Sequence, residues 1–408
     1  MKRNILFIIP WLPYPMVSGG HQALYNGILA IKNDFNVFVV YEKQTGNDEA
    51  ENHFHDFFPN VVLLPFSSYK MPLHERIAFW AHVLIRKLFR EKITDEERMC
   101  NRWVKTISPH KKELVMHIDK VCHKYNFDII QVEMPWFISL VLSLPKHSKK
   151  IFVHHELGFV CRNLEKEKQS ENVYVDAFKS FADLNEIGLL NLYDRIITLS
   201  SIDSEKLREK GVVAPISTSF AILKSDIAAK TSLCEGNILT FVGPDSHLPN
   251  VEGLTWFCDN CWGKLRVQNP NVKLRIIGKW NKSHMQQFCD KYPGVEFMGF
   301  VDDLNASLLG SIMIVPITIG SGIRMKILEA CSLGIPFVST SVGAEGIPVI
   351  NGEHCYLADT PDEFVDGIVN LQNPEIQEKF IKNSKLMIQE NYSVDALRYN
   401  RLSIYNNL

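Results

Sequence analysis

The chain has 408 residues, of which 46% are hydrophobic and 22% are charged, and its formal net charge is −2. This length exceeds one ordinary hydrophobic core and predicts two or three globular domains. The nearly balanced charge gives no reason to expect a nucleic-acid partner. Nine cysteines spread over this length do not form a secreted disulfide framework, so we expect a reduced, cytoplasmic location.

The N-terminus resembles a signal peptide only superficially. Lys2 and Arg3 precede the apolar run 5–9, but prolines at positions 10, 13 and 15 end that run. The run therefore predicts a buried first strand. No segment approaches the roughly 18 apolar residues that are needed to span a bilayer.

Strand-like runs alternate with helical patterns in both halves of the chain, which predicts two doubly wound parallel α/β sheets. The expected strands are 4–9, 37–41, 61–65, 129–132, 150–153 and 195–199 in the first half, and 238–242, 273–277, 295–298, 312–315 and 336–339 in the second.

A looser stretch separates the two sets of strands and places a linker near residues 215–235. We therefore expect an N-terminal Rossmann-like domain over residues 1–215 and a C-terminal one over residues 216–385. Ligands of such sheets bind at the carboxyl ends of the strands, so two facing sheets would place the active site in a cleft between the domains.

Three features of the first half follow predicted strands. Gly19, Gly20 and His21 lie in a loop where backbone can approach a ligand, although a plain strand–helix turn is the alternative. Glu133 and His155 follow later strands, and a histidine there can bind a sugar hydroxyl or transfer a proton. The neighbouring His154 is expected to be a core histidine, and the pair lacks the spacing of metal ligands.

Residues 70–124 carry thirteen Lys and Arg against seven Asp and Glu. Within them, segment 74–92 has the pattern of a basic amphipathic helix, which can lie on an anionic membrane bearing a lipid-linked acceptor. The alternative is a core-packed helix with a solvated basic face. In the second half, Cys258 and Cys261 form a lone C-x-x-C in a helical pattern, and we expect buried or incidental thiols there.

The most informative segment runs from strand 312–315 through Gly320, Ser321, Gly322 and Ile323 into a helical pattern. A glycine loop before a helix offers backbone amides and a partial positive charge to an anion. Arg324 and Lys326 are expected to add full charges in the first turn of this helix, and Glu329 shares a side of the helix with Lys326. This chemistry suits the diphosphate and hydroxyl groups of a nucleotide sugar, although such a Lys–Glu pair alone would be an ordinary surface pair.

The second half contains the motifs Phe241-Val-Gly243, Leu248-Pro-Asn250, Trp256-Phe257, Leu274-Arg-Ile-Ile-Gly278, Phe297-Met-Gly-Phe-Val-Asp-Asp303, Gly320-Ser-Gly-Ile-Arg-Met-Lys-Ile-Leu-Glu-Ala330, Gly334-Ile-Pro-Phe-Val338 and Ser341-Val-Gly-Ala-Glu-Gly346. The first half contains the weaker motifs Gly19-Gly20, Val153-His-His-Glu156 and Asp194-Arg-Ile-Ile-Thr-Leu-Ser200. In these motifs the chain resembles the family 4 glycosyltransferases, which have the GT-B fold, strongly in its second half and moderately in its first half.

The resemblance implies retaining transfer of a sugar from a nucleoside diphosphate sugar to a hydroxyl acceptor, in bacterial-type surface polysaccharide or glycolipid assembly. It implies no metal, and a C-terminal helix within 386–408 that packs back on the first domain. Arg324, Lys326 and His155 would be the catalytic residues. The donor would contact Gly243, Gly320, Ser321, Gly322, Ile323 and Glu329, whereas Gly19, Gly20, His21 and Glu133 would lie near the acceptor or the phosphates.

Two departures from the family keep other functions open. Ser321 stands where many members have a glutamate, and the loop after Gly243 lacks the usual Arg and Lys. The phosphate contacts therefore fall to Arg324, Lys326 and the loop amides. The alternatives are a nucleotide-sugar-binding pseudotransferase that acts as a scaffold and a nucleotide-sugar 2-epimerase.

Overall fold

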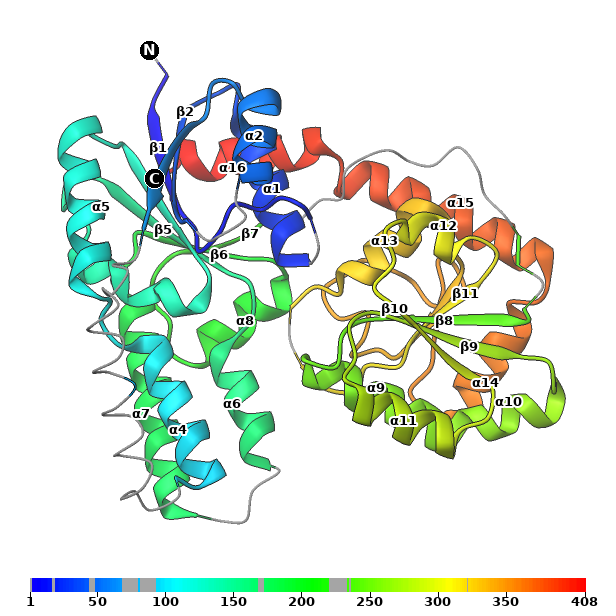
Figure 1. The fold of residues 1–408 in the computed structure, drawn as a ribbon. Coiled ribbons are helices and arrows are strands. Elements are labelled where there is room, and N and C mark those ends of the chain that lie inside the picture. Colours follow the sequence, from blue (N-terminus) through cyan, green and yellow to red (C-terminus); the bar gives the residue numbers. More distant parts are fainter. Residues whose placement is uncertain are drawn as a thin grey trace. The chain divides into compact units, whose positions relative to one another are not determined.

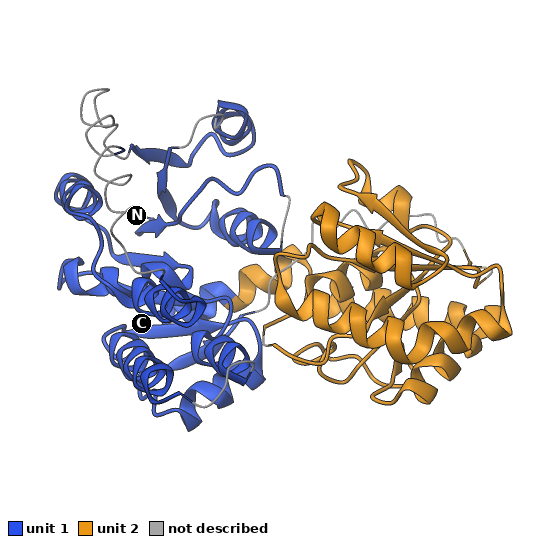
Figure 2. Cartoon of the chain, turned by 60° about the horizontal axis from the view of Figure 1, so that its bottom comes forward, with its two compact units in different colours: residues 1–219, 401–408 blue, residues 220–400 orange. Residues whose placement is uncertain are grey.

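The structure is a computed structural model of the chain. It describes residues 2–16, 19–43, 48–67, 80, 93–167, 172–219, 233–234, 236–320 and 322–408. These fall into two compact units, residues 1–219 with 401–408, and residues 220–400 (Figure 2). Apart from Trp80, the basic segment 74–92 lies outside the described residues, as do Ser321 and most of the expected linker.

Unit 1 contains a seven-stranded parallel sheet in the order β3-β2-β1-β4-β5-β6-β7. Its strands are β1 (Asn4–Ile8), β2 (Asn36–Glu42), β3 (Val62–Phe66), β4 (Ile129–Glu133), β5 (Lys149–His154), β6 (Arg195–Thr198) and β7 (Ile216–Thr218). Its helices are α1 (Gly19–Ile31), α2 (Asp48–Phe57), α4 (Asp95–Ile107), α5 (Lys112–Tyr125), the 3₁₀ helix η1 (Pro135–Ser143), α6 (Gly158–Glu167), α7 (Val173–Leu190) and α8 (Ser201–Glu209).

Unit 2 contains a six-stranded parallel sheet in the order β10-β9-β8-β11-β12-β13. Its strands are β8 (Ile238–Val242), β9 (Lys273–Ile277), β10 (Val295–Gly299), β11 (Ile312–Val315), β12 (Phe337–Ser339) and β13 (Tyr356–Leu357). Its helices are α9 (Leu248–Phe257), the π-helical turn η2 (Cys258–Trp262), α10 (Gly263–Gln268), α11 (Lys282–Lys291), α12 (Leu304–Leu308), α13 (Met325–Leu333), α14 (Pro361–Asn370) and α15 (Pro374–Asn391), and α16 (Val394–Asn406) follows them.

Both sheets are doubly wound, as the alternating pattern predicts. In unit 2, α9, α10 and α11 cover one face of the sheet and α13 and α15 cover the other (Figure 1). All eleven predicted strands are present, with ends that shift by at most two residues. The sequence interpretation missed β7 and β13, because strands of three and two residues are too short to show a pattern.

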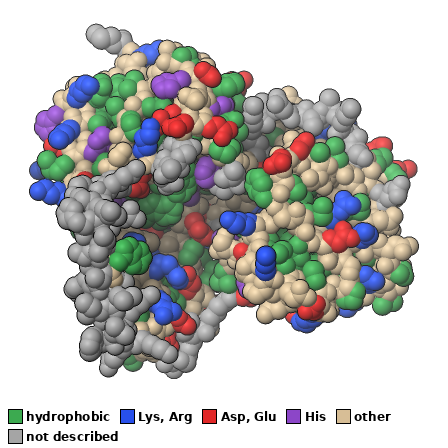
Figure 3. Space-filling view, viewed as in Figure 1, with side chains coloured by type: hydrophobic (Ala, Val, Ile, Leu, Met, Phe, Trp, Pro, Cys, Tyr) green, Lys and Arg blue, Asp and Glu red, His purple; other side chains and the backbone are tan. Residues whose placement is uncertain are grey.

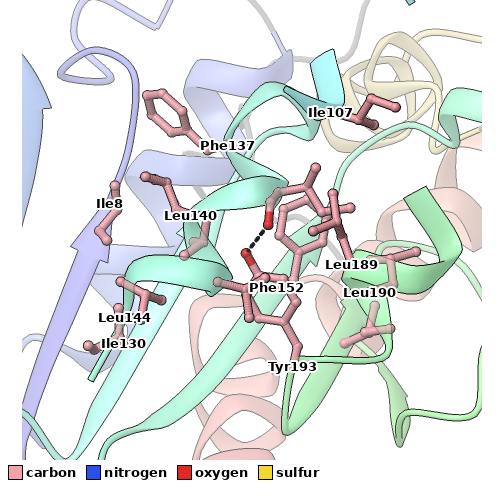
Figure 4. Close-up of a cluster of buried hydrophobic side chains, with 14 of the residues drawn as sticks. Ile8, Ile107, Ile130, Phe137, Leu140, Leu144, Phe152, Leu189, Leu190 and Tyr193 are labelled. Carbon is pink, nitrogen blue, oxygen red and sulfur yellow. Dashed lines mark hydrogen bonds between the residues drawn. The ribbon is translucent and has the colours of Figure 1, made fainter. Parts of the chain in front are cut away.

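One large hydrophobic cluster of unit 1 lies between one face of its sheet and the helices α4, α5 and α7. Strand side chains alternate between the faces of a sheet, so Ile8, Ile130 and Phe152 share this face. They pack against apolar side chains of η1 and α7, and Tyr193 among them donates its hydroxyl to the Ile138 carbonyl at 2.8 Å (Figure 4). Burial of this apolar surface is what stabilises the strands locally.

The C-terminal helix α16 carries residues of both units, and residues from Arg401 onward belong to unit 1. Arg3 donates to the Tyr405 carbonyl at 3.0 Å, and Arg195 donates to the Asn407 carbonyl at 3.0 Å. The thiols of Cys258 and Cys261 are buried in unit 2, as predicted. Within the described ranges, no helix combines the length and the apolar character needed to cross a lipid bilayer.

Helix α9 packs so closely on the end of β11 that one position admits only glycine. A Cβ atom on Gly253 would lie 2.4 Å from the Pro316 carbonyl oxygen. We therefore expect Gly253→Ala to lower the free energy of unfolding by about 1–3 kcal/mol, the usual cost of overpacking. Urea denaturation measures this change.

Gly263→Ala is the matched control, because Gly263 also lies in a helix of unit 2 but has no atom within 4 Å of the added methyl. Alanine is the better helix former, so this variant should be unchanged or more stable by up to about 1 kcal/mol. Equal effects of the two substitutions would contradict the close approach of α9 to β11.

Candidate functional site

The sheet of unit 2 brings two loops together at its topological switch point. The chain leaves β8 toward β9 on one side and returns to β11 on the other, so the carboxyl ends of β8 and β11 are neighbours. Gly243 follows β8, and the loop of Gly320 and Gly322 follows β11. Ligands of open α/β sheets bind at such a point.

Asn250, in the first turn of α9, joins these two loops. Its side-chain amide donates to the Pro244 carbonyl at 2.9 Å and accepts a hydrogen bond from Lys326 Nζ at 2.9 Å. A Cβ atom on Gly243 would lie 2.5 Å from the Asn250 side chain, so glycine permits this packing. The sequence analysis named Asn250 only as part of the motif Leu248-Pro-Asn250 and did not predict its contact with Lys326.

Lys326 is half-buried, and its ammonium group lies 4.6 Å from the centroid of the Phe241 ring. Burial and the adjacent Arg324 charge lower the pKa of Lys326 to about 7, against an opposing effect of Glu329. Each of these causes is electrostatic, so a bound anion would favour the charged form of this lysine.

Arg324 lies in a different place from the one expected. It is the N-cap residue of α13, and the first turn begins at Met325. Its buried guanidinium donates from Nη1 to the Gly322 carbonyl at 2.6 Å and so braces the glycine loop. Gly320 has a φ of +113°, which strongly favours glycine. Glu329 is half-buried one turn into the helix, and Ile323 is half-buried in the loop.

Two helix N-termini therefore meet at this edge. The N-cap residues His247 of α9 and Arg324 of α13 make no side-chain capping hydrogen bond. In α9 the second residue is Pro249, which has no N–H, and the Asn250 amide donates to the His247 carbonyl at 2.9 Å. The first amides of a helix lack partners within the helix and attract anions. Amides, Lys326 and Arg324 together form a candidate anion site within unit 2.

Unit 1 also presents polar and aromatic side chains near its own switch point, which lies between β1 and β4. His155, just after β5, shares a hydrogen bond of 2.7 Å between its Nε2 and Glu133 Oε2 at the end of β4. Gly19, Gly20 and His21 were expected in a loop, but they form the first turn of α1. His21 stacks on Trp11 with ring centroids 5.3 Å apart. Burial lowers the pKa of His21. The ring centroids of the exposed Trp136 and of Trp11 are 5.8 Å apart. The sequence analysis singled out neither tryptophan.

His154 is the core histidine that was expected. It is buried, and its Nε2 lies 3.1 Å from Glu186 Oε1. Arg162 bonds the same carboxylate. Burial alone would raise the pKa of Glu186, but the hydrogen bond with His154 and the charge of Arg162 lower it. Adjacent histidines thus enter two separate networks.

A cavity of about 170 Å³ opens in unit 1 at the carboxyl ends of β1 and β2. Burial lowers the pKa of His110 in its wall. The walls are mostly apolar and consist of Ile8, Ile9, Val40, Tyr41, Glu42, Phe66, His110, Lys111, Leu114 and Phe137. Among the residues that the structure describes, no three His, Cys, Asp or Glu side chains gather closely enough to hold a metal ion.

Charge on the visible face of unit 2 is mixed, with Lys and Arg interspersed among Asp and Glu (Figure 3). This distribution agrees with the net charge of −2 and lacks the large basic stripe typical of nucleic-acid binding on that face.

Comparison with known proteins gives the class of the fold. Residues 236–373 match the family model described as glycosyl transferases group 1, and this segment contains every donor-side residue named above. The solved structure of Anabaena HepE in complex with UDP and glucose is similar over 100% of both chains, with a TM-score of 0.68 and 13% identity. The two-domain Rossmann-like GT-B fold is therefore confirmed.

Two further similarities are informative. A mutant of S. aureus TarM, in complex with fondaparinux, alpha-GlcNAc-glycerol and UDP, has a TM-score of 0.69 and 11% identity over 99% of this chain and 100% of that one. An uncharacterized 44.6 kDa protein in the cps region of Klebsiella pneumoniae is 24% identical over 284 residues, which are 67% of this chain and 72% of that protein.

The lowered pKa of Lys326 makes a prediction about stability. Its ordinary pKa is 10.5, so between about pH 7 and about pH 10 the unfolded chain holds a proton that the folded chain has lost. Lys326 therefore makes the free energy of unfolding rise with pH in this window. We expect Lys326→Met to remove that rise, measured by urea denaturation at about pH 7 and about pH 10.

All other titrating groups are common to both proteins, so the difference between their slopes isolates Lys326. Lys282→Met, at an exposed position in the first turn of α11, should keep the wild-type slope. A Lys326→Met slope equal to that of the wild type would show that this lysine is charged and solvated in the folded protein.

Proposed function

We propose that the protein is a glycosyltransferase that moves a sugar from a nucleoside diphosphate sugar to a hydroxyl acceptor, with retention of configuration. The observation that carries the proposal is the junction of Lys326, Asn250 and the two uncapped helix N-termini at the switch point of unit 2. Such a junction suits a diphosphate. The match of residues 236–373 and the UDP complexes of proteins with the same fold support it.

The chemistry follows from the charge that develops on the departing diphosphate. Preorganised cations and amides aimed at such charge are commonly the largest catalytic contribution. The protonated Lys326 would stabilise the negative charge on the departing diphosphate. Arg324 would hold the loop whose amides bind the phosphates, and Glu329 would bind the ribose. Retention, and proton transfer to the diphosphate itself, rest on the family resemblance.

Unit 1 supplies groups of a different chemistry, which suit the acceptor. The pair of Glu133 and His155 can bind a hydroxyl, and the indoles of Trp11 and Trp136 can stack on a sugar ring. The mostly apolar cavity nearby suits the less polar part of an acceptor. With the relative from a cps region, these features favour surface polysaccharide or glycolipid assembly. A cytoplasmic location and peripheral contact with an anionic membrane belong to the same proposal, and they rest on the cysteine usage and the basic segment 74–92 of the sequence.

A thermal-shift screen over nucleotides and nucleotide sugars tests the donor, because a ligand stabilises the folded state by RT ln(1 + [L]/Kd). The stabilising nucleotide sugar is then incubated with and without candidate acceptors, and products are separated by chromatography. Transfer to an acceptor supports the proposal. Isomerisation of the donor alone would identify an epimerase, and binding without turnover over many acceptors would identify a scaffold.

Removal of the donor-side charges should act selectively. Lys326→Ala should lower kcat by roughly 100-fold or more. Glu329→Ala should weaken donor binding by about 1–3 kcal/mol, the range for a hydrogen bond to a charged group. The exposed Lys282 again supplies the control, since Lys282→Ala should leave both quantities unchanged. Near-normal kinetics in both site variants would defeat this assignment.

Catalysis should not require a divalent metal, because Lys326 and the helix N-termini supply the positive charge. We expect kcat to be unchanged after exhaustive treatment with EDTA, and added Mg²⁺ or Mn²⁺ to change it by less than about twofold. A chelator-sensitive activity that one metal restores would contradict the proposed source of positive charge.

A further inference from the structure

Two polar side chains lie on the same buried face of β4. Gln131 and Glu133 are two residues apart, so both project from the face opposite Ile130 and Val132. Gln131 is 1% exposed and Glu133 is 3% exposed. Buried polar groups are costly unless they are hydrogen-bonded, so their partners matter.

Those partners form one continuous chain of hydrogen bonds. Gln131 Nε2 donates to Glu133 Oε1 at 2.5 Å, and His155 Nε2 lies 2.7 Å from Glu133 Oε2. At the other end, the Tyr405 hydroxyl donates to Gln131 Oε1 at 2.7 Å. Tyr405 lies on the C-terminal helix α16, one turn after Arg401, whose charge acts on the Tyr405 hydroxyl.

The chemistry of these groups fixes the direction of every bond in the chain. The Glu133 carboxylate has no proton to donate, so Gln131 must present its NH₂ group to Glu133, and Gln131 Oε1 accepts the proton of the Tyr405 hydroxyl. A carboxylate only accepts, so His155 Nε2 must carry a proton, and in the neutral ring Nδ1 is the acceptor.

The Tyr405 hydroxyl is not needed to dock the helix. The backbone carbonyls of Tyr405 and Asn407 already accept hydrogen bonds from Arg3 and Arg195. The Tyr405 ring packs edge-on against Phe35 with centroids 5.4 Å apart. The hydroxyl instead extends the contact of α16 across the sheet to the strand end where His155 lies.

We propose that Tyr405 is a positioning residue for sugar transfer, which acts through Gln131 and Glu133 to fix the tautomer and ring orientation of His155. This inference rests on the proposed function, in which His155 Nδ1 accepts a hydrogen bond from an acceptor hydroxyl. A histidine held by a carboxylate depends on that carboxylate for its tautomer, and the carboxylate here depends on the C-terminal helix.

We call the hydrogen-bonded series of Tyr405, Gln131, Glu133 and His155 the relay. Tyr405→Phe tests the relay, because it removes the Tyr405 hydroxyl and keeps the ring. We expect kcat for transfer to fall roughly tenfold, while the donor KM and the thermal shift with UDP stay at wild-type values. In ¹⁵N-histidine-labelled protein, the His155 signals should change from one Nε2–H tautomer to a mixture. These signals are identified among the 14 histidines by their loss in His155→Asn.

Tyr193→Phe is the matched control. Tyr193 is also a buried tyrosine of unit 1, and its hydroxyl donates to the Ile138 carbonyl (Figure 4). It packs in the hydrophobic cluster on the face of the sheet opposite Gln131 and Glu133. We expect this variant to change thermal stability without changing kcat or the His155 signals. A second test is Glu133→Gln, whose amide would donate to Nε2 and move the proton to Nδ1, with a loss of about 100-fold or more in kcat.

The possible outcomes distinguish a failure of the proposed relay from a failure of the proposed glycosyltransferase function. If Tyr405→Phe keeps the wild-type kcat and His155 signals, the relay is wrong, although transfer stands. If His155→Asn keeps the wild-type kcat, the catalytic assignment of His155 is wrong. If the wild-type protein transfers no sugar, the proposed function fails, and the His155 signals in Tyr405→Phe still decide whether the relay sets the tautomer.

Discussion

One hydrogen bond connects the two loops on which the candidate donor site depends. Lys326 comes from the helix after β11 and Asn250 from the helix after β8, and they meet because the doubly wound order makes those two strands neighbours. Without the Asn250 oxygen, a lysine over the Phe241 ring would be buried with fewer compensating groups. Burial and the adjacent Arg324 charge lower the pKa of this lysine, so its charged form would gain from a bound anion.

The two units have the same kind of sheet topology but carry different side chains at the carboxyl ends of their strands. Each sheet presents loops at its switch point, but unit 2 offers helix N-termini and cations, whereas unit 1 offers a carboxylate, an imidazole and indoles. Anionic phosphates fit the first set and neutral hydroxyl-bearing rings fit the second. The proposed division between donor and acceptor thus follows from charge and hydrogen-bonding capacity, independently of how the units are arranged.

Sequence patterns predicted those features whose causes are local. Buried parallel strands read as continuous apolar runs, so the central strands of both sheets were found, and the glycine loop before α13 was visible from its spacing. The contacts that complete each site are not local. Asn250 and Lys326 are 76 positions apart, and Gln131 and Tyr405 are 274 apart. The cap position of Arg324 also escaped prediction, because a capping residue is defined by its backbone angles.

The adjacent histidines show how strand geometry assigns roles that composition cannot. His154 ends β5 on the face of Phe152, where it joins the buried network of Glu186 and Arg162. His155 is the next residue, so it turns to the other face and meets Glu133. A network with two buried charges stabilises only while it stays complete, which anchors the strand end. The buried His154 is therefore joined by one peptide bond to His155, so the hydrogen bond of His154 with Glu186 helps to position its neighbour at the edge of the sheet.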